Sequence, residues 1–386
     1  MNHVIKPSSG QHWDILDGLR GLAILMVVAC HGVYANPEGA AWQLWLSDFI
    51  SSGGIGVQMF FVLSGFLISY PFLKARDRSL DAWYQPGYAT RRCLKIIPPY
   101  VVCIVLFAAF YYFERGDLAM VKTGLLWLVG VPHVVNVERA MEFNGSFWSL
   151  WVEIGFYALL PFAFRWTRGR DAMRSATVIG GLLIGMSVGA SFLSWPDAPQ
   201  SVPYMVYLNG RFPNGLANFG WGILFAGWFV RRQTQKTASP PGGKRGYAGL
   251  GLLLAALVWQ TVVFRTGLDG RWFAHALATL LTGFATLLLL FLLLEPHTLA
   301  ARVFSARWLK YLGLISYEWF LLHQPVIHYF RRSVGHAQGN LLTYLFIVVT
   351  PMILTLIAAA IIYEFFSAPI IEWGRARLAK ARANPS

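Results

Sequence analysis

The feature that most constrains this chain is a succession of apolar segments, each about 20 residues long. A helix of that length crosses the hydrocarbon core of a bilayer, because each residue rises about 1.5 Å. Only 13% of the 386 residues are charged and 56% are hydrophobic. We therefore predict an all-α polytopic membrane protein. Ten transmembrane helices are expected, at residues 15–35, 54–73, 96–113, 146–165, 175–195, 212–230, 247–264, 272–294, 309–330 and 341–366.

The basic residues predict the orientation of these helices. If the shorter apolar segment 121–136 does not cross, 23 of the 32 Lys and Arg residues lie on the side of the N-terminus and 8 on the other, with Arg20 inside the first span. Cytoplasmic loops carry this excess in membrane proteins. We therefore predict both termini in the cytoplasm, a multi-pass location in the cytoplasmic (inner) membrane, and a re-entrant or interfacial segment at 121–136. The net charge of +14 has the same origin, so no nucleic-acid partner is expected.

Little sequence remains outside the spans for a further domain. The longest polar stretches are 74–95, 114–145 and the Pro/Gly-rich loop 233–246, and no internal repeat is visible. We predict one transmembrane domain over residues 1–386, with a flexible tail at 383–386. The three cysteines lack the spacing of metal ligands, so neither a disulfide framework nor a metal site is expected.

Ionisable side chains inside membrane spans are costly and indicate functional sites. Arg20 and His31 are eleven residues apart in the first span, which places them on nearly the same helix face with a rise of about 16 Å. Asp17, one turn before Arg20, can pair with it. The alternative is that Asp17 and Arg20 only anchor a helix end and that His31 is a structural histidine whose hydrogen bonds are satisfied in the protein interior.

Two further titratable residues are predicted at a depth similar to that of His31. Glu153 and His323 each lie about seven residues from the outer end of a predicted span. We expect the three side chains to converge. A buried imidazole can act as a general base on a hydroxyl, and a carboxylate beside it can orient the ring and stabilise its protonated form.

A basic cluster, TRRCLKIIPPY, stands at the cytoplasmic mouth of the third predicted span. Its Arg91, Arg92 and Lys95 are typical of an ordinary positive flank. Beneath the helix face that carries Arg20, the same cluster can hold an anionic nucleotide such as coenzyme A, because guanidinium groups bind phosphate oxygens in bidentate fashion.

Six motifs resemble the successive signatures of the acyltransferase 3 family of integral-membrane O-acyltransferases. They are LDGLRGLAILMVVACHG (16–32), GVQMFFVLSGFLIS (56–69), RRCLKIIPPY (91–100), FWSLWVEIGFYALLP (147–161), LGLISYEWFLLHQPVI (312–327) and YEFFSAP (363–369). Their order and spacing follow the whole chain. The resemblance implies a ten-helix fold, acyl-CoA as donor, and a carbohydrate or polyketide hydroxyl as acceptor.

The resemblance also implies roles for individual residues. The chain also departs from the family pattern. Lys95 stands where arginine is more usual, and Glu318 and Gln324 are unusual residues beside His323. The last two departures concern the pocket expected to bind the acceptor. The chain carries no appended hydrolase-like domain, so we expect it to work alone or to pass its acyl group to a partner. The predicted residues are His31 and Glu153 for catalysis, Arg20, Arg91, Arg92 and Lys95 for the coenzyme, and Asp17, Tyr317 and His323 in supporting or substrate-binding positions.

We therefore predict a membrane O-acyltransferase with His31 as general base. It would move an acyl group, taken as acetyl, from cytoplasmic acyl-CoA to a sugar hydroxyl of a cell-surface polysaccharide, lipopolysaccharide or exopolysaccharide. An acyl-histidine intermediate and a macrolide-type acceptor are open alternatives. A transporter or flippase is the alternative of a different class. The expected partners are the acyl donor, a glycan or lipid-linked sugar and membrane lipids, with no metal and an undetermined oligomeric state.

Overall fold

The computed structural model describes residues 13–33, 41–130, 137–193, 215–235, 244–266, 272–334 and 341–383. Within these ranges the elements are helices, and no strand occurs among them. The end of the predicted tail, 384–386, lies outside the described residues. The elements are α1 (Asp14–Gly32), α2 (Ala41–Ser51), η1 (Ser52–Ile55), α3 (Gly56–Arg78), α4 (Tyr88–Arg115), α5 (Leu118–Trp127), α7 (Val137–Asn144), α8 (Phe147–Trp166), α9 (Ala172–Leu193), α11 (Leu216–Gln235), α12 (Lys244–Thr266), α13 (Trp272–Leu290), η4 (Phe291–Leu294), α14 (Leu299–Phe304), α15 (Arg307–Leu314), α16 (Ser316–Val334), α17 (Leu341–Ile362), the π-helical turn η5 (Tyr363–Ser367) and α18 (Ala368–Ala383).

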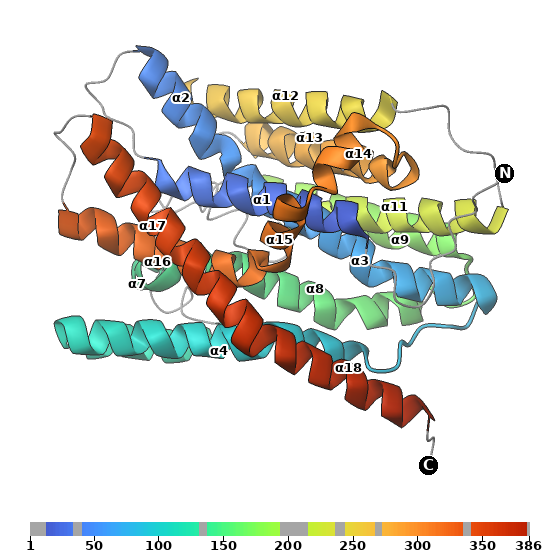
Figure 1. Cartoon of the computed structure of the whole chain (residues 1–386). Coiled ribbons are helices and arrows are strands. Elements are labelled where there is room, and N and C mark those ends of the chain that lie inside the picture. Colours follow the sequence, from blue (N-terminus) through green and yellow to red (C-terminus); the bar gives the residue numbers. More distant parts are fainter. Residues whose placement is uncertain are drawn as a thin grey trace.

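The long helices lie side by side in one bundle, with α12 and α13 toward one edge and α4 at the other (Figure 1). Helix α1 runs through the interior and packs against α3, α15 and α16. In the described part of the chain, eight helical segments are long and apolar enough to span a membrane. Helices α11 and α16 occupy two further predicted spans within the same bundle. The chain is therefore an all-α polytopic membrane protein.

Two predicted boundaries differ from the structure near the site. Helix α4 begins at Tyr88, directly after Gly87 in a left-handed conformation (φ 72°), so the RRCLK cluster lies on the helix itself. The predicted span 309–330 is broken between α15 and α16, where the hydroxyl of Ser316 donates to the carbonyl oxygen of Gly313 at 2.7 Å. This break directs the first turns of α16 toward α1.

The segment between α4 and α8 enters the bundle and returns to the same end. Helix α5 folds back along α4, and the Tyr100 hydroxyl, well inside α4, donates to the carbonyl oxygen of Trp127 at 2.6 Å. Helix α7 lies near the end of α4 again, because the Tyr111 hydroxyl donates to the carbonyl oxygen of Glu142 at 3.0 Å. The described part of segment 121–136 therefore folds back along α4 inside the bundle, and residues 131–136 lie outside the described ranges.

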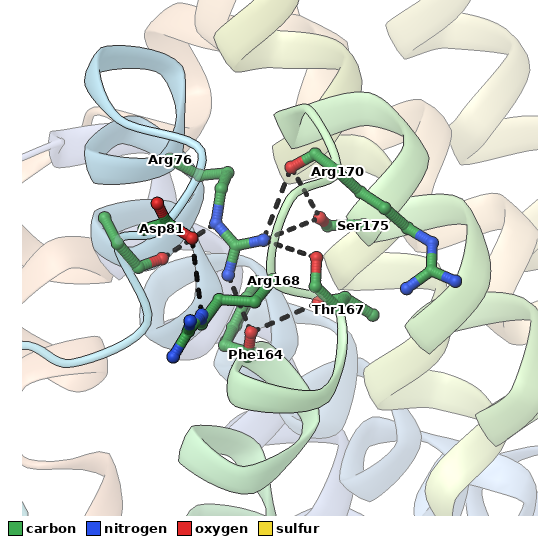
Figure 2. Close-up of polar contacts among 8 residues, drawn as sticks. Arg76, Asp81, Phe164, Thr167, Arg168, Arg170 and Ser175 are labelled. Atoms are coloured by element: carbon green, nitrogen blue, oxygen red, sulfur yellow. Dashed lines mark hydrogen bonds and ion pairs between the residues drawn. The ribbon is translucent and has the colours of Figure 1, made fainter.

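Arg76 ties three helices together where α3 and α8 end. Its side chain is fully buried at the end of α3. It donates to the carbonyl oxygens of Phe164 and Thr167 at 2.6 Å each, and to that of Ala82 at 2.7 Å. Figure 2 shows the guanidinium group surrounded by backbone oxygens at the end of α8 and by Ser175 of α9. A cation placed there satisfies carbonyl groups that the helix end leaves without partners. We call this side of the bundle the basic end.

Candidate active site

A cavity of about 420 Å³ lies at the basic end, between α1, α3, α4, α8, α15, α16, η5 and α18. We call it the basic cavity, because cations outnumber acids in its lining. Its charged residues are Arg20, Arg91, Arg92, Lys95, Arg375, Asp17, Glu153 and Glu372. All four residues predicted to bind the coenzyme are among them: Arg20, Arg91, Arg92 and Lys95. The lining also holds Glu153, which was predicted to be catalytic, and the predicted supporting residues Asp17 and Tyr317.

The first two turns of α4 place three cations in this lining. Arg91 donates to the carbonyl oxygen of Pro86 at 3.0 Å, and the guanidinium group of Arg92 lies 5.7 Å from the centre of the Tyr157 ring. The Nε of Arg92 is buried without a hydrogen-bond partner among the described residues. A buried cationic donor of this kind is suited to an anionic ligand.

A second, narrow cavity of about 40 Å³ adjoins the first and extends farther into the bundle. The two share Arg20, Ser64, Glu153 and Tyr317 in their linings. Along α16, the lining of the narrow cavity continues to Phe320, whose ring centre is 5.6 Å from that of His323. We call this cavity the passage, because it continues the basic cavity along α16 as far as Phe320; neither His31 nor His323 lines it.

Arg20 and Tyr317 are held by contacts between helices at the junction of the two cavities. Arg20 donates to the hydroxyl of Ser316 at 3.2 Å, and its guanidinium group lies 5.6 Å from the centre of the Phe60 ring. The hydroxyl of Tyr317 donates to the carbonyl oxygen of Ile96 at 2.9 Å. These contacts fasten α1 and α4 to the start of α16.

Glu153 lies at the same junction and makes no hydrogen bond with His31. Its Oε1 accepts hydrogen bonds from the hydroxyls of Ser64, at 2.6 Å, and Tyr157. The expected convergence with His31 assumed that α8 begins at the membrane surface. In the structure α8 begins inside the bundle, because the ring of its first residue, Phe147, lies 4.9 Å from that of Tyr100. The carboxylate is therefore nearer the basic end than its position in the span predicts.

The contact with His31 that the sequence predicts for a carboxylate is made instead by a second imidazole. The Nδ1 of His31 lies 3.2 Å from the Nε2 of His323, and 2.9 Å from the carbonyl oxygen of Val27. His323 is fully buried on α16, whereas His31 is partly exposed. The structure thus brings two of the three titratable residues together at the end of α1.

Several residues of the site were not assigned from the sequence. Ser64 lies in the FFVLSGF motif, and Tyr157 follows Glu153 by one helical turn, so spacing was a usable signal for Tyr157. Arg331 and Arg375 were interpreted only as loop charges. Neither could be placed from local sequence, because Arg331 contacts the end of the distant helix α1 and Arg375 lines a cavity built from several helices. No group of three His, Cys, Asp or Glu side chains suited to a metal ion occurs in the ranges that the structure describes.

Comparison with known sequences identifies the family. The profile of the acyltransferase 3 family, described as an acyltransferase domain, matches residues 13–363. The chain belongs to the acyltransferase 3 family. No solved structure matches this acyltransferase 3 protein.

The chain is also similar to two named bacterial proteins. It is 23% identical over 390 residues to the O-acetyltransferase OatA of Staphylococcus aureus, which covers 96% of this chain and 59% of the relative. It is 23% identical over 379 residues to the peptidoglycan O-acetyltransferase OatA of Listeria monocytogenes, which covers 93% of this chain and 56% of the relative. This acyltransferase 3 protein therefore spans little more than half of the length of these relatives.

Proposed function

We propose that the protein is a membrane O-acetyltransferase that moves an acetyl group from acetyl-CoA to a sugar hydroxyl of a cell-surface polysaccharide. The observation that carries this proposal is that a basic cavity, the narrow passage adjoining it and the pair of His31 and His323 follow one another along α1 and α16. The names of the relatives support O-acetylation of a glycan, and peptidoglycan is the acceptor to test first.

The basic cavity is suited to the nucleotide part of the donor. Coenzyme A carries several phosphate charges, and Arg91 and Arg92 offer guanidinium groups that bind phosphate oxygens in pairs. The basic end would face the cytoplasm, where the excess of Lys and Arg is expected. In this orientation the protein would lie in the cytoplasmic membrane with its donor site open to the cytoplasmic pool of acyl-CoA.

The passage marks the path along which the slender arm that links the nucleotide to the thioester would enter, and it must widen from about 40 Å³ to admit the arm. Arg20 at its mouth and His31 are eleven residues apart on α1, a rise of about 16 Å. That span is comparable with the length of an extended pantetheine arm. Phe60, Phe61 and Phe320 line the passage and would exclude water from an arm lying in it.

His31 would serve as the general base. Its imidazole takes the proton of the acceptor hydroxyl as the hydroxyl oxygen attacks the thioester carbon. The carbon–sulfur bond then breaks, and the same proton passes to the leaving thiolate. Glu153 lies outside hydrogen-bond reach of the imidazole, so we assign it to the donor path and not to proton transfer.

The test is an acetyl-transfer assay with the purified protein in proteoliposomes, labelled acetyl-CoA and peptidoglycan oligosaccharides. We expect His31→Ala to abolish transfer while detergent-extracted yield and thermal stability stay normal. We expect the pair Arg91→Ala with Arg92→Ala to raise the KM for acetyl-CoA by tenfold or more, on the order of 1.4 kcal/mol of binding.

The matched control removes two cations from outside the cavity. Arg377 and Lys380 lie exposed on α18 and do not line the basic cavity, so their double alanine variant should leave the KM unchanged. A folded His31→Ala variant that still transfers acetyl would overturn the assignment of the base. An equal change of KM in both double variants would show that positive charge in general, and not the basic cavity in particular, attracts the donor.

A further inference from the structure

The contacts of the histidine pair, His31 and His323, indicate which ring nitrogen of each residue carries the proton. The Nδ1 of His323 lies 2.8 Å from the carbonyl oxygen of Phe320 and 3.2 Å from that of Trp319. Carbonyl oxygens only accept hydrogen bonds, so this Nδ1 is the donor and bears the proton. A neutral imidazole holds one ring proton, and the Nε2 of His323 therefore presents a lone pair.

That lone pair faces His31 and, together with a backbone carbonyl oxygen, determines the tautomer of His31. The Nδ1 of His31 lies 3.2 Å from the Nε2 of His323 and 2.9 Å from the carbonyl oxygen of Val27. Both neighbours are acceptors, so the Nδ1 of His31 bears the proton. The thiol of Cys30, 3.4 Å from the same Nδ1, donates to Val27 at 3.1 Å and leaves this arrangement intact. The Nε2 of His31 is left with its lone pair free.

We infer that His323 is a positioning residue that, together with the carbonyl oxygen of Val27, fixes the ring orientation and the tautomer in which the Nε2 of His31 acts as the base. This inference rests on the proposed function. A hydrogen bond to Nδ1 fixes both the tautomer and the rotation of a catalytic imidazole, as the aspartate does in a Ser-His-Asp triad. Here the acceptor is a neutral ring nitrogen, which is less costly to bury in a membrane-spanning bundle than a carboxylate.

The hydrogen bond persists through the transfer step. When the Nε2 of His31 has taken the hydroxyl proton, the ring is an imidazolium ion and its Nδ1–H still points to the Nε2 of His323. The bond becomes charge-assisted and stabilises the cation. The proton on Nε2 then goes to the thiolate, and His323 stays neutral throughout. His323 acts through His31 and not on the substrate, because its side chain is fully buried and both its nitrogens are engaged.

Two amide substitutions at position 323 separate this role from simple packing. In His323→Gln the amide group reaches the place of Nε2 and its oxygen can accept from His31. In His323→Asn the amide lies at the place of Nδ1, so it can keep the bond to Phe320 but offers no acceptor to His31. Both variants replace the imidazole with a polar, uncharged amide, and each serves as the control for the other.

In the acetyl-transfer assay we expect His323→Gln to retain kcat within tenfold and His323→Asn to lose about 10²-fold, because a small misplacement of a catalytic group can cost that much. The KM for acetyl-CoA should be unchanged in both, because His323 does not line the basic cavity. Thermal stability in detergent is measured alongside, and the comparison is made between variants that unfold within a few degrees of the unsubstituted protein.

The outcomes distinguish this inference from the proposed function. If His31→Ala is inactive and the two position-323 variants have equal kcat, high or low, the positioning role is wrong while the base assignment stands. If the KM rises in step with the loss of kcat, the role is also wrong, because His323 then supports the donor site. If folded His31→Ala is active, the proposed function itself fails.

Discussion

The guanidinium Nη2 of Arg331, near the end of α16, lies 2.7 Å from the backbone carbonyl oxygen of His31. The same nitrogen lies 2.7 Å from the carbonyl oxygen of Gly32 and 2.6 Å from that of Val33. Helix α1 ends at Gly32, and the last carbonyls of a helix have no partner within it. A cation there satisfies these oxygens and complements the negative end of the helix dipole. Helix α16 therefore holds both the ring of His31, through His323, and its backbone.

Replacing Arg331 with methionine should loosen this end of α1. We expect the free energy of unfolding to fall by about 1–3 kcal/mol, because buried carbonyl oxygens lose a charged donor. We also expect kcat to fall about tenfold, since small displacements of a catalytic group are costly. The measurements are thermal unfolding in detergent and the acetyl-transfer assay.

Arg332→Met is the matched control, because the neighbouring arginine has the same size and charge in a different setting. Arg332 pairs with Glu142 at 2.6 Å, with side-chain exposures of 56% and 35%. Exposed ion pairs contribute about 0–1 kcal/mol. If the two substitutions change the free energy of unfolding and kcat equally, the contact of Arg331 with the end of α1 does not support the site.

Arg76 supports a second prediction, about stability alone. Lysine keeps its charge but cannot donate in several directions from one plane, so Arg76→Lys should leave some of the carbonyl oxygens in Figure 2 without a partner. We expect a loss of about 3 kcal/mol in the free energy of unfolding, and more for Arg76→Met. Arg78→Lys, at an exposed position two residues later, should change the unfolding temperature little. Equal stability of the two lysine variants would contradict the role of Arg76.

The close contact of α1 with α15 supports a third prediction. A Cβ at Gly21 would overlap the backbone carbonyl oxygen of Leu309, so alanine there must push two helices apart. We expect Gly21→Ala to lower the free energy of unfolding by about 1–3 kcal/mol and to reduce transfer, since Arg20 lies beside it. Gly181→Ala on α9 is the control, because its Cβ would meet open space and alanine favours helix. A Gly21→Ala variant as stable as Gly181→Ala would show that α1 and α15 can separate at no cost.

Sequence reasoning succeeded where the deciding property is local. Runs of apolar residues predicted the helices of the bundle, and helical spacing placed Arg20 and His31 along one helix. It failed where tertiary packing decides the depth of a helix. Helix α8 begins inside the bundle, beside Tyr100 of α4, and Glu153 therefore does not reach His31. The pairing of His31 with His323 also depends on how α1 crosses α16, which no spacing within either helix can reveal.

Glu153 supports the last prediction, on recognition of the donor. Its carboxylate lines both cavities, and the hydrogen bonds that the described residues make with it end on Oε1. An anion in this position repels phosphates but can accept a hydrogen bond from a neutral N–H group. The pantetheine arm of acetyl-CoA carries two amide N–H groups. We therefore expect Oε2 of Glu153 to accept from one of them, and Glu153→Gln to raise the KM for the donor by about tenfold.

Acetyl-pantetheine, which has the arm without the nucleotide, separates this role from phosphate binding. Glu153→Gln should raise the KM for acetyl-CoA and for acetyl-pantetheine by similar factors, because both donors carry the amides. The double variant Arg91→Ala with Arg92→Ala should raise the KM for acetyl-CoA only. Steady-state rates over both donor concentrations give these values. If Glu153→Gln leaves the KM unchanged and lowers only kcat, this prediction is wrong and the carboxylate acts in the chemical step.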